Sequence, residues 1–215
     1  MTSLELMTEE VQVWVAPLDV SDGRYDALAR TLPPDERDRA ASLTPIARRR
    51  FVVARGILRK LLAGFTGTAA EKLQFSYGHA GKPILIDRDD IHFNVSHSAD
   101  LGLFAFAPDR PVGVDVENER PVRRLLDVAQ RFMSDEELRT LAAAPDAERN
   151  SAFLRSWVVR EARLKAQGKG VWDGPGKDEP GRKITHKLFV PRPNYIAAVA
   201  APHGDWRLFT CAMKE

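Results

Sequence analysis

Cysteine is nearly absent from this 215-residue chain, because Cys211 is the only one. A single thiol excludes an intramolecular disulfide and any metal site built from several cysteines. The apolar neighbours of Cys211 indicate a packed side chain and not a nucleophile. Long apolar runs are missing as well, since no stretch approaches the roughly eighteen residues that a membrane span needs. Residues 1–10 are acidic and carry no signal-peptide pattern, so we expect a cytoplasmic protein without membrane contact.

A large excess of charge of one sign is also missing, since the formal net charge is only +2. The basic residues are nevertheless clustered. Residues 30–60 contain nine Lys or Arg and three Asp or Glu, a local +6, and residues 151–170 contain five and one, a local +4. Such clusters suit a polyanionic ligand, either a nucleotide or a nucleic acid. For any single arginine, a solvated helix face is the more common explanation.

With 44% hydrophobic residues, the chain can bury a substantial core in one domain or in two small ones. Apolar–polar alternation predicts strands, and apolar residues at helical spacing predict helices. Strands are expected at 11–15, 91–95, 101–107, 112–117, 187–190, 195–201 and 206–210, the last three antiparallel. A short helix is expected after Pro33, and another follows a capping box at Ser134. Three further helices are expected. They run from Thr44 as N-cap to Gly64 as terminator, from Pro121 to about Met133, and from about Asp146 to Gln167.

Both halves of the chain therefore combine a long helix with several short strands. This order predicts an α+β fold with two similar α/β lobes, residues 1–108 and residues 109–215, that meet near 108–113. A cleft between two lobes is a natural ligand site. Residues 172–183, rich in Gly, Pro and charged side chains, are expected to form a mobile loop.

Three acidic residues in two short motifs carry the most specific chemical information. In Gly113-Val114-Asp115-Val116-Glu117, alternation puts the valines on one face of a strand and both carboxylates on the other. Their Cα atoms lie about 7 Å apart, close enough for the carboxylates to share one Mg²⁺. The second motif is residues 157–165, Trp-Val-Val-Arg-Glu-Ala-Arg-Leu-Lys. In a helix, its Glu161 and Lys165 share one face. Exposed acids on a strand and a surface Glu–Lys pair are the ordinary alternatives.

A polar turn is expected at residues 94–98, Asn-Val-Ser-His-Ser, directly after a strand. Hydroxyls, an imidazole and backbone N–H groups at such a turn can bind phosphate. The ordinary alternative is a turn in which His97 caps a backbone carbonyl.

Taken together, these segments resemble the Sfp-type 4′-phosphopantetheinyl transferases. The match covers about residues 30–170, and the motifs stand in the order of that family. The matching segments are the arginine-rich 47–60, 77–83 (Tyr-Gly-His-Ala-Gly-Lys-Pro), 93–98, 113–117 and 157–170. Arg160 stands where the family often has lysine, and Arg37 and Arg39 are possible equivalents of lysines that often lie upstream of the arginine-rich helix.

The resemblance implies a fold, a reaction and a set of site residues. The fold would be two lobes related by a pseudo-two-fold axis, each with a small, mainly antiparallel sheet and a long helix. Coenzyme A would bind between the lobes, and Mg²⁺ would assist transfer of its 4′-phosphopantetheine group to a serine of an apo acyl, peptidyl or polyketide carrier protein. The implied Mg²⁺ ligands are Asp115, Glu117 and Glu161. The implied catalytic residues are Glu161 as base, Lys165 at the leaving group, and Asp115. The implied coenzyme A contacts are Arg48, Arg55, Lys82, Ser96, His97 and Lys165.

Two other functions compete with this expectation. A Mg²⁺-dependent nucleotide phosphohydrolase could use the same three acids with water as the attacking group. The many basic or polar positions implied for a 3′-phosphate argue against it. A nucleic-acid-binding protein would account for the +6 segment, but the aromatic residues are too scattered for a stacking platform. We therefore expect no nucleic-acid partner, and we expect a monomer.

Overall fold

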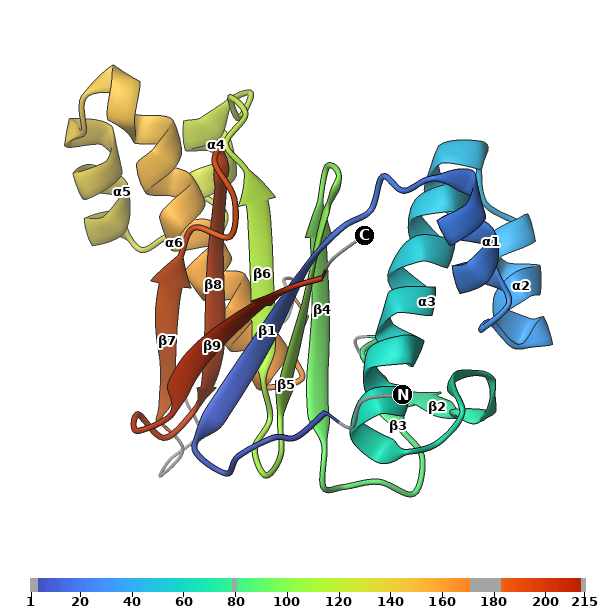
Figure 1. Ribbon diagram of the computed structural model, residues 1–215. Coiled ribbons are helices and arrows are strands. Elements are labelled where there is room, and N and C mark those ends of the chain that lie inside the picture. The colour runs from blue at the N-terminus through green and yellow to red at the C-terminus, as the bar shows by residue number, and fades with distance from the viewer. Residues whose placement is uncertain (1–3, 79–80, 171–182, 214–215) are drawn as a thin grey trace.

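Two sheets face each other in the middle of the molecule, and a long helix packs on the outer face of each (Figure 1). The computed structural model describes residues 4–78, 81–170 and 183–213. The loop expected at 172–183 lies almost entirely outside these residues. No helix in the described part of the chain is long and apolar enough to cross a membrane.

The first sheet has the strand order β4-β5-β1-β9. These strands are β4 (His92–Ser98), β5 (Leu101–Ala107), β1 (Glu10–Pro17) and β9 (Arg207–Ala212). Helix α3 (Pro45–Thr66) covers its outer face, next to α1 (Asp22–Ala29) and α2 (Pro34–Ala41). A short 3-10 helix, Ala70–Lys72, leads into a hairpin of β2 (Phe75–Tyr77) and β3 (Pro83–Leu85).

The second sheet has the order β6-β8-β7 and is antiparallel throughout. It consists of β6 (Gly113–Asn118), β8 (Tyr195–Pro202) and β7 (Ile184–Phe189). Helix α6 (Asp146–Ala166) packs on it, and the short helices α4 (Leu125–Ala129) and α5 (Asp135–Ala143) lie beside α6. β4 and β6 run side by side in the middle of Figure 1, although they belong to different sheets.

The molecule has four layers, namely α3, the first sheet, the second sheet and α6, and the alternation of side chains along the strands explains them. On β6, Val114 and Val116 enter the core between the sheets, where they join Val13 and Leu103 of the first sheet. The opposite faces of the central strands pack against the helices, so β5 and β8 are buried along their whole length. A strand covered on both sides reads as a continuous apolar run, as in the segment 195–202.

The predicted α+β fold is confirmed, with small, mainly antiparallel sheets and two long helices. Pseudo-two-fold symmetry stays a prediction. The antiparallel assignment of the last strand was wrong, because β9 pairs in parallel with β1. The C-terminal strand of the chain therefore completes the sheet that contains the N-terminal strand.

Two helix ends also differ from the prediction. Gly64 lies inside α3, against the side chain of Leu4. The helix ends at Thr66, and Gly67 caps it in the left-handed conformation, with φ +70°. Glycine at this position avoids the steric cost of a side chain, which explains the later end. The helix expected from Pro121 to Met133 is only the five-residue α4, preceded by Arg124 at φ 54°. The capping box at Ser134 is confirmed.

Candidate active site

Strand β6 approaches the backbone of α6 closely because residue 113 is a glycine. A Cβ atom on Gly113 would lie 2.0 Å from the carbonyl oxygen of Ala162 and 2.4 Å from the backbone nitrogen of Ala166. No real side chain tolerates such distances, so only glycine permits this approach. As a result, Lys165 of α6 comes within hydrogen-bonding distance of Asp115 of β6.

The predicted site residues Asp115, Lys165 and Ser96 form one cluster, in which Asp115 and Ser96 are buried and Lys165 is partly exposed. Lys165 Nζ donates to Asp115 Oδ1 at 2.7 Å, to the Val114 carbonyl at 3.2 Å and to Ser96 Oγ at 3.3 Å. Ser96 Oγ in turn donates to Asp115 Oδ1 at 2.8 Å. Asp115 is only 5% exposed, so its charge is paired rather than solvated.

Glu161 belongs to the same site and is buried at 7% exposure. Burial raises the pKa of Glu161; nearby Lys165 opposes this shift, and Asp115 and Glu117 reinforce it. Burial also raises the pKa of Glu117, against the effect of a hydrogen bond from Ser98. Because Glu161 is buried and Lys165 pairs with Asp115, the ordinary surface Glu–Lys pair does not describe these two residues.

Two carboxylate oxygens at this site have no hydrogen-bond partner in the described part of the chain. They are Asp115 Oδ2 and Glu161 Oε1, and both are buried. Buried carboxylate oxygens of this kind are suitable ligands for a hard cation such as Mg²⁺. Among residues 4–78, 81–170 and 183–213, however, no three His, Cys, Asp or Glu side chains are grouped as a metal site. The ammonium of Lys165 supplies the nearest positive charge to Asp115.

Two cavities adjoin each other between α3 and α6, since Pro83 and Val95 line both. The first, which we call the Lys165 cavity, has a volume of about 300 Å³. It is lined by Gly81, Lys82, Pro83, Asn94, Val95, Glu161, Lys165, Gly168, Lys169 and Gly170. The second, the arginine cavity, has a volume of about 570 Å³. It is lined by Arg39, Leu43, Thr44, Ile46, Ala47, Arg50, Phe51, Ala54, Arg55, Leu58, Pro83, Val95 and His97.

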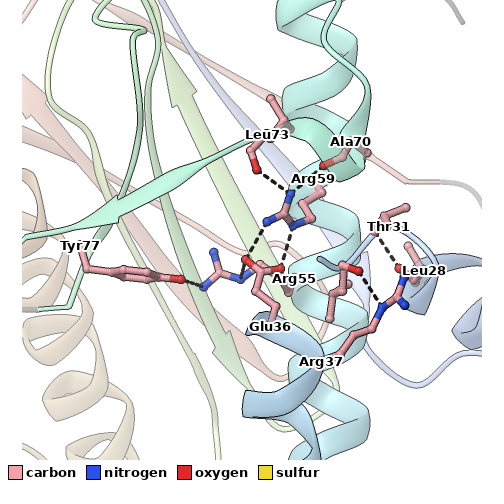
Figure 2. Close-up of polar contacts among 10 residues, drawn as sticks. Leu28, Thr31, Glu36, Arg37, Arg55, Arg59, Ala70, Leu73 and Tyr77 are labelled. Carbon is pink, nitrogen blue, oxygen red and sulfur yellow. Dashed lines mark hydrogen bonds and ion pairs between the residues drawn. The ribbon is translucent and has the colours of Figure 1, made fainter. Parts of the chain in front are cut away.

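Arg55, which lines the arginine cavity, is held between a carboxylate and a phenol (Figure 2). Its Nε lies 3.5 Å from Glu36 Oε1, and its Nη2 donates to the Tyr77 hydroxyl at 3.3 Å. Glu36 is itself fixed by two hydrogen bonds from the buried Arg59, at 2.7 and 2.9 Å. Arg55 Nη1 is buried and donates to no acceptor in the described residues. A guanidinium with an unused donor beside a cavity is suited to an anion.

His97 lines the same cavity on the side of β4. Its pKa is lowered, first by partial burial and then by repulsion from Lys165 and Arg50. The two nearby cations show that His97 lies in a positive field, which would favour a bound anion.

The two remaining predicted coenzyme A contacts, Arg48 and Lys82, differ in whether they line a cavity. Arg48 does not line either cavity; its guanidinium donates to the carbonyl groups of Ala40, Ala41 and Leu43 and so caps the end of α2. Lys82 lines the Lys165 cavity, with its Nζ donating to the Val112 carbonyl at 2.8 Å and the Lys165 carbonyl at 3.1 Å.

The electrostatic state of Lys82 reflects this enclosure. Burial and the charge of Lys165 lower the pKa of Lys82 to about 8. At neutral pH the side chain of Lys82 is still charged, although the charged form is less favoured than in water. A bound phosphate would stabilise this charged form again.

Two arginines besides Arg55 line the arginine cavity, namely Arg39 and Arg50. Arg39 was predicted only as a possible equivalent of a family lysine, and Arg50 was not predicted as a site residue. Arg37, the other possible equivalent, donates to the Leu32 carbonyl instead.

The turn expected at residues 94–98 was wrong, because these residues belong to strand β4. From that strand, Asn94 and Ser98 contact β6, the strand that carries the acids. The signal for these two was available, because residues 94, 96 and 98 share one face of a strand by the same alternation that grouped the acids.

Comparisons with known proteins agree with this geometry. Residues 111–208 match the 4′-phosphopantetheinyl transferase superfamily. The chain is 36% identical over 220 residues to the 4′-phosphopantetheinyl transferase HetI of Nostoc sp., across 95% of this chain and 93% of the relative. It is also 36% identical over 152 residues to the 4′-phosphopantetheinyl transferase Sfp of Bacillus subtilis, across 62% of this chain and 65% of the relative.

Proposed function

Because this chain belongs to the 4′-phosphopantetheinyl transferase superfamily, we propose that it transfers the 4′-phosphopantetheine group of coenzyme A to a carrier protein. The acceptor is a serine hydroxyl of an apo acyl, peptidyl or polyketide carrier. The serine oxygen bonds to the β-phosphorus of coenzyme A, the bond from that phosphorus to the bridging oxygen breaks, and 3′,5′-ADP leaves with that oxygen.

One observation supports this function above the others, namely the two adjoining cavities of different chemical character. The arginine cavity offers Arg39, Arg50, Arg55 and His97 to a phosphate. The Lys165 cavity offers a buried glutamate and several cations a short distance along the same surface. A ligand with an isolated phosphate at one end and a pyrophosphate further along, as in coenzyme A, matches this arrangement.

The residues of the Lys165 cavity divide the chemistry between them. Glu161 lines this cavity, where its carboxylate accepts the proton of the attacking serine. Lys165 and Lys82 neutralise charge on the phosphates and on the departing oxygen. Transfer of this kind depends on positioning and charge neutralisation, so these residues are sufficient in type for the reaction.

Mg²⁺ is part of the proposal, with Asp115, Glu117 and Glu161 as its ligands. The unpartnered oxygens of Asp115 and Glu161 support this assignment. When bound, the ion would neutralise the pyrophosphate and polarise its oxygens. Lys165 now pairs with Asp115, so it has to share or release that carboxylate when the ion is present. Both cavities are formed by residues of one chain, and we expect a monomer.

Intact-mass spectrometry of apo carrier proteins tests the function directly. Each carrier is incubated with this protein, coenzyme A and Mg²⁺, and a gain of one phosphopantetheine on the carrier serine is expected. A carrier with that serine replaced by alanine should gain nothing. A matched enzyme control is Glu119→Gln, which removes an exposed acid two residues beyond Glu117 and should load normally.

Other outcomes would assign the protein to a rival class. Release of 3′,5′-ADP at the same rate without any carrier would indicate a phosphohydrolase. A salt-sensitive mobility shift of DNA or RNA, with no loading of any carrier, would indicate nucleic-acid binding.

A further inference from the structure

The contact between β4 and β6 is polar, unlike the hydrophobic core that the two sheets share. Asn94, Ser96 and Ser98 alternate along β4, and each is only 6% to 8% exposed. By contrast, the core between β1 and β5 of the first sheet and β8 of the second is built from apolar side chains. Buried polar side chains destabilise a fold unless they form hydrogen bonds. Three of them in a row on one strand therefore indicate specific hydrogen-bond partners on the facing strand.

Each of the three side chains finds its partner on β6. Asn94 Oδ1 accepts from the backbone N–H of Val114 at 2.9 Å. Ser96 Oγ donates to Asp115 Oδ1 at 2.8 Å, and Ser98 Oγ donates to Glu117 Oε2 at 2.9 Å. Side chains of β4 thus align β6 where no backbone ladder joins the two strands.

The proton of Ser98 is directed to Glu117 by a second hydrogen bond. Ser98 Oγ accepts from the backbone N–H of Asn118 at 3.1 Å, so a lone pair of this oxygen is already used. The hydroxyl has one proton to donate, and it points to Glu117 Oε2. The two bonds hold Glu117 relative to its own strand and leave Oε1 for another ligand.

We propose that Ser98 is a positioning residue that orients Glu117 for binding of the divalent cation. This inference rests on the proposed function and extends it to a residue outside the ligand set. Ser98 acts through Glu117 and touches neither the ion nor the substrate. Partners of this kind typically change metal affinity or activity by about 10- to 100-fold when they are removed.

Ser98→Ala deletes the donor and retains the strand. Mn²⁺ is the probe, and its binding is followed by electron paramagnetic resonance with coenzyme A present and no carrier, so the readout does not depend on turnover. We expect Mn²⁺ affinity to fall by about 10- to 100-fold. In the loading assay, half-maximal rate should need correspondingly more Mg²⁺, and the rate at saturating Mg²⁺ should return close to that of the wild type.

Two further variants separate orientation from structural damage. Ser98→Thr keeps the hydroxyl on a side chain that favours strands, and it should restore most of the Mn²⁺ affinity. Ser151→Ala is the matched control, because Ser151 Oγ donates to Glu119 Oε1 at 2.8 Å outside both cavities. It should leave Mn²⁺ affinity unchanged.

Wild-type Mn²⁺ affinity in Ser98→Ala would overturn the inference. So would equal loss of rate at every Mg²⁺ concentration in Ser98→Ala and Ser98→Thr, since that pattern indicates a structural effect. The wild-type protein distinguishes these results from failure of the proposed function. If the wild type neither loads a carrier nor binds Mn²⁺, the function itself is wrong.

Discussion

Gly113→Ala should damage catalysis more than stability, because it forces α6 away from β6. The new Cβ would lie 2.0 Å from the carbonyl oxygen of Ala162, whereas ordinary contact begins at 3.4 Å. Relieving this clash takes a shift of about 1.4 Å between strand and helix. The helix carries Glu161 and Lys165, and a misplacement of about 1 Å can lower a rate on the order of 10²-fold.

The same clash also lowers stability. Overpacking a buried site typically costs about 1–3 kcal/mol. For a chain of this size, that corresponds to a fall in Tm of roughly 2–12 °C. Carrier loading should therefore be measured well below the Tm of the variant, together with a thermal unfolding curve.

Gly56→Ala is the matched control for overpacking. Its Cβ would lie 2.7 Å from the Cβ of Leu28 and 2.9 Å from the Leu28 carbonyl oxygen, at the contact between α3 and α1. We expect a similar loss of Tm with turnover nearly unchanged at low temperature. If Gly113→Ala and Gly56→Ala lose turnover in the same proportion to their loss of Tm, Gly113 serves stability alone. Near wild-type turnover in Gly113→Ala would refute the positional reasoning altogether.

Three further predictions concern the cavities. Glu161→Gln keeps the size of the side chain but accepts a proton poorly, so turnover should fall by about 10²-fold or more, with coenzyme A affinity measured by calorimetry much less affected. Arg55→Ala and His97→Ala should each lower the affinity for coenzyme A by about tenfold or more, because each removes a charge-assisted hydrogen bond to the 3′-phosphate that contributes about 1.5–3 kcal/mol. The affinity for 3′-dephospho-coenzyme A should stay nearly the same. Lys82→Met should change the pH dependence of unfolding. The pKa of Lys82 in the folded protein, about 8, lies below its ordinary value of 10.5, so the unfolded chain binds more protons between these two pH values. In thermal unfolding, the stability of the wild type should therefore rise relative to that of the variant as pH increases through this interval.

Each of these has its own contradicting result. Equal losses of affinity and turnover in Glu161→Gln would make Glu161 a ligand and not a base. Equal weakening of both nucleotides in the Arg55 or His97 variants would place the 3′-phosphate elsewhere. Arg48→Ala is the control for the Arg55 and His97 variants. It should lower Tm without changing the preference for coenzyme A over 3′-dephospho-coenzyme A, since Arg48 caps α2. A constant stability difference across pH would show that Lys82 titrates normally.

The sequence by itself determined what depends on local periodicity. Alternation along 112–117 separated the valines from the acids, and the structure places Val114 and Val116 in the core between the sheets while Asp115 contacts Lys165. Helical spacing placed Glu161 and Lys165 on one face, and both line one cavity. Such patterns are set within a single strand or helix, so they can be read without knowledge of its neighbours.

Only the tertiary structure decided which elements became neighbours. Arg48 and Arg55 lie on one helix and looked equivalent in the sequence, yet Arg48 caps α2 while Arg55 lines the arginine cavity beside Glu36. The parallel pairing of β9 with β1 and the meeting of Ser98 with Glu117 join segments far apart in the chain. Long-range pairing depends on the packing of the whole core, and no local pattern records it.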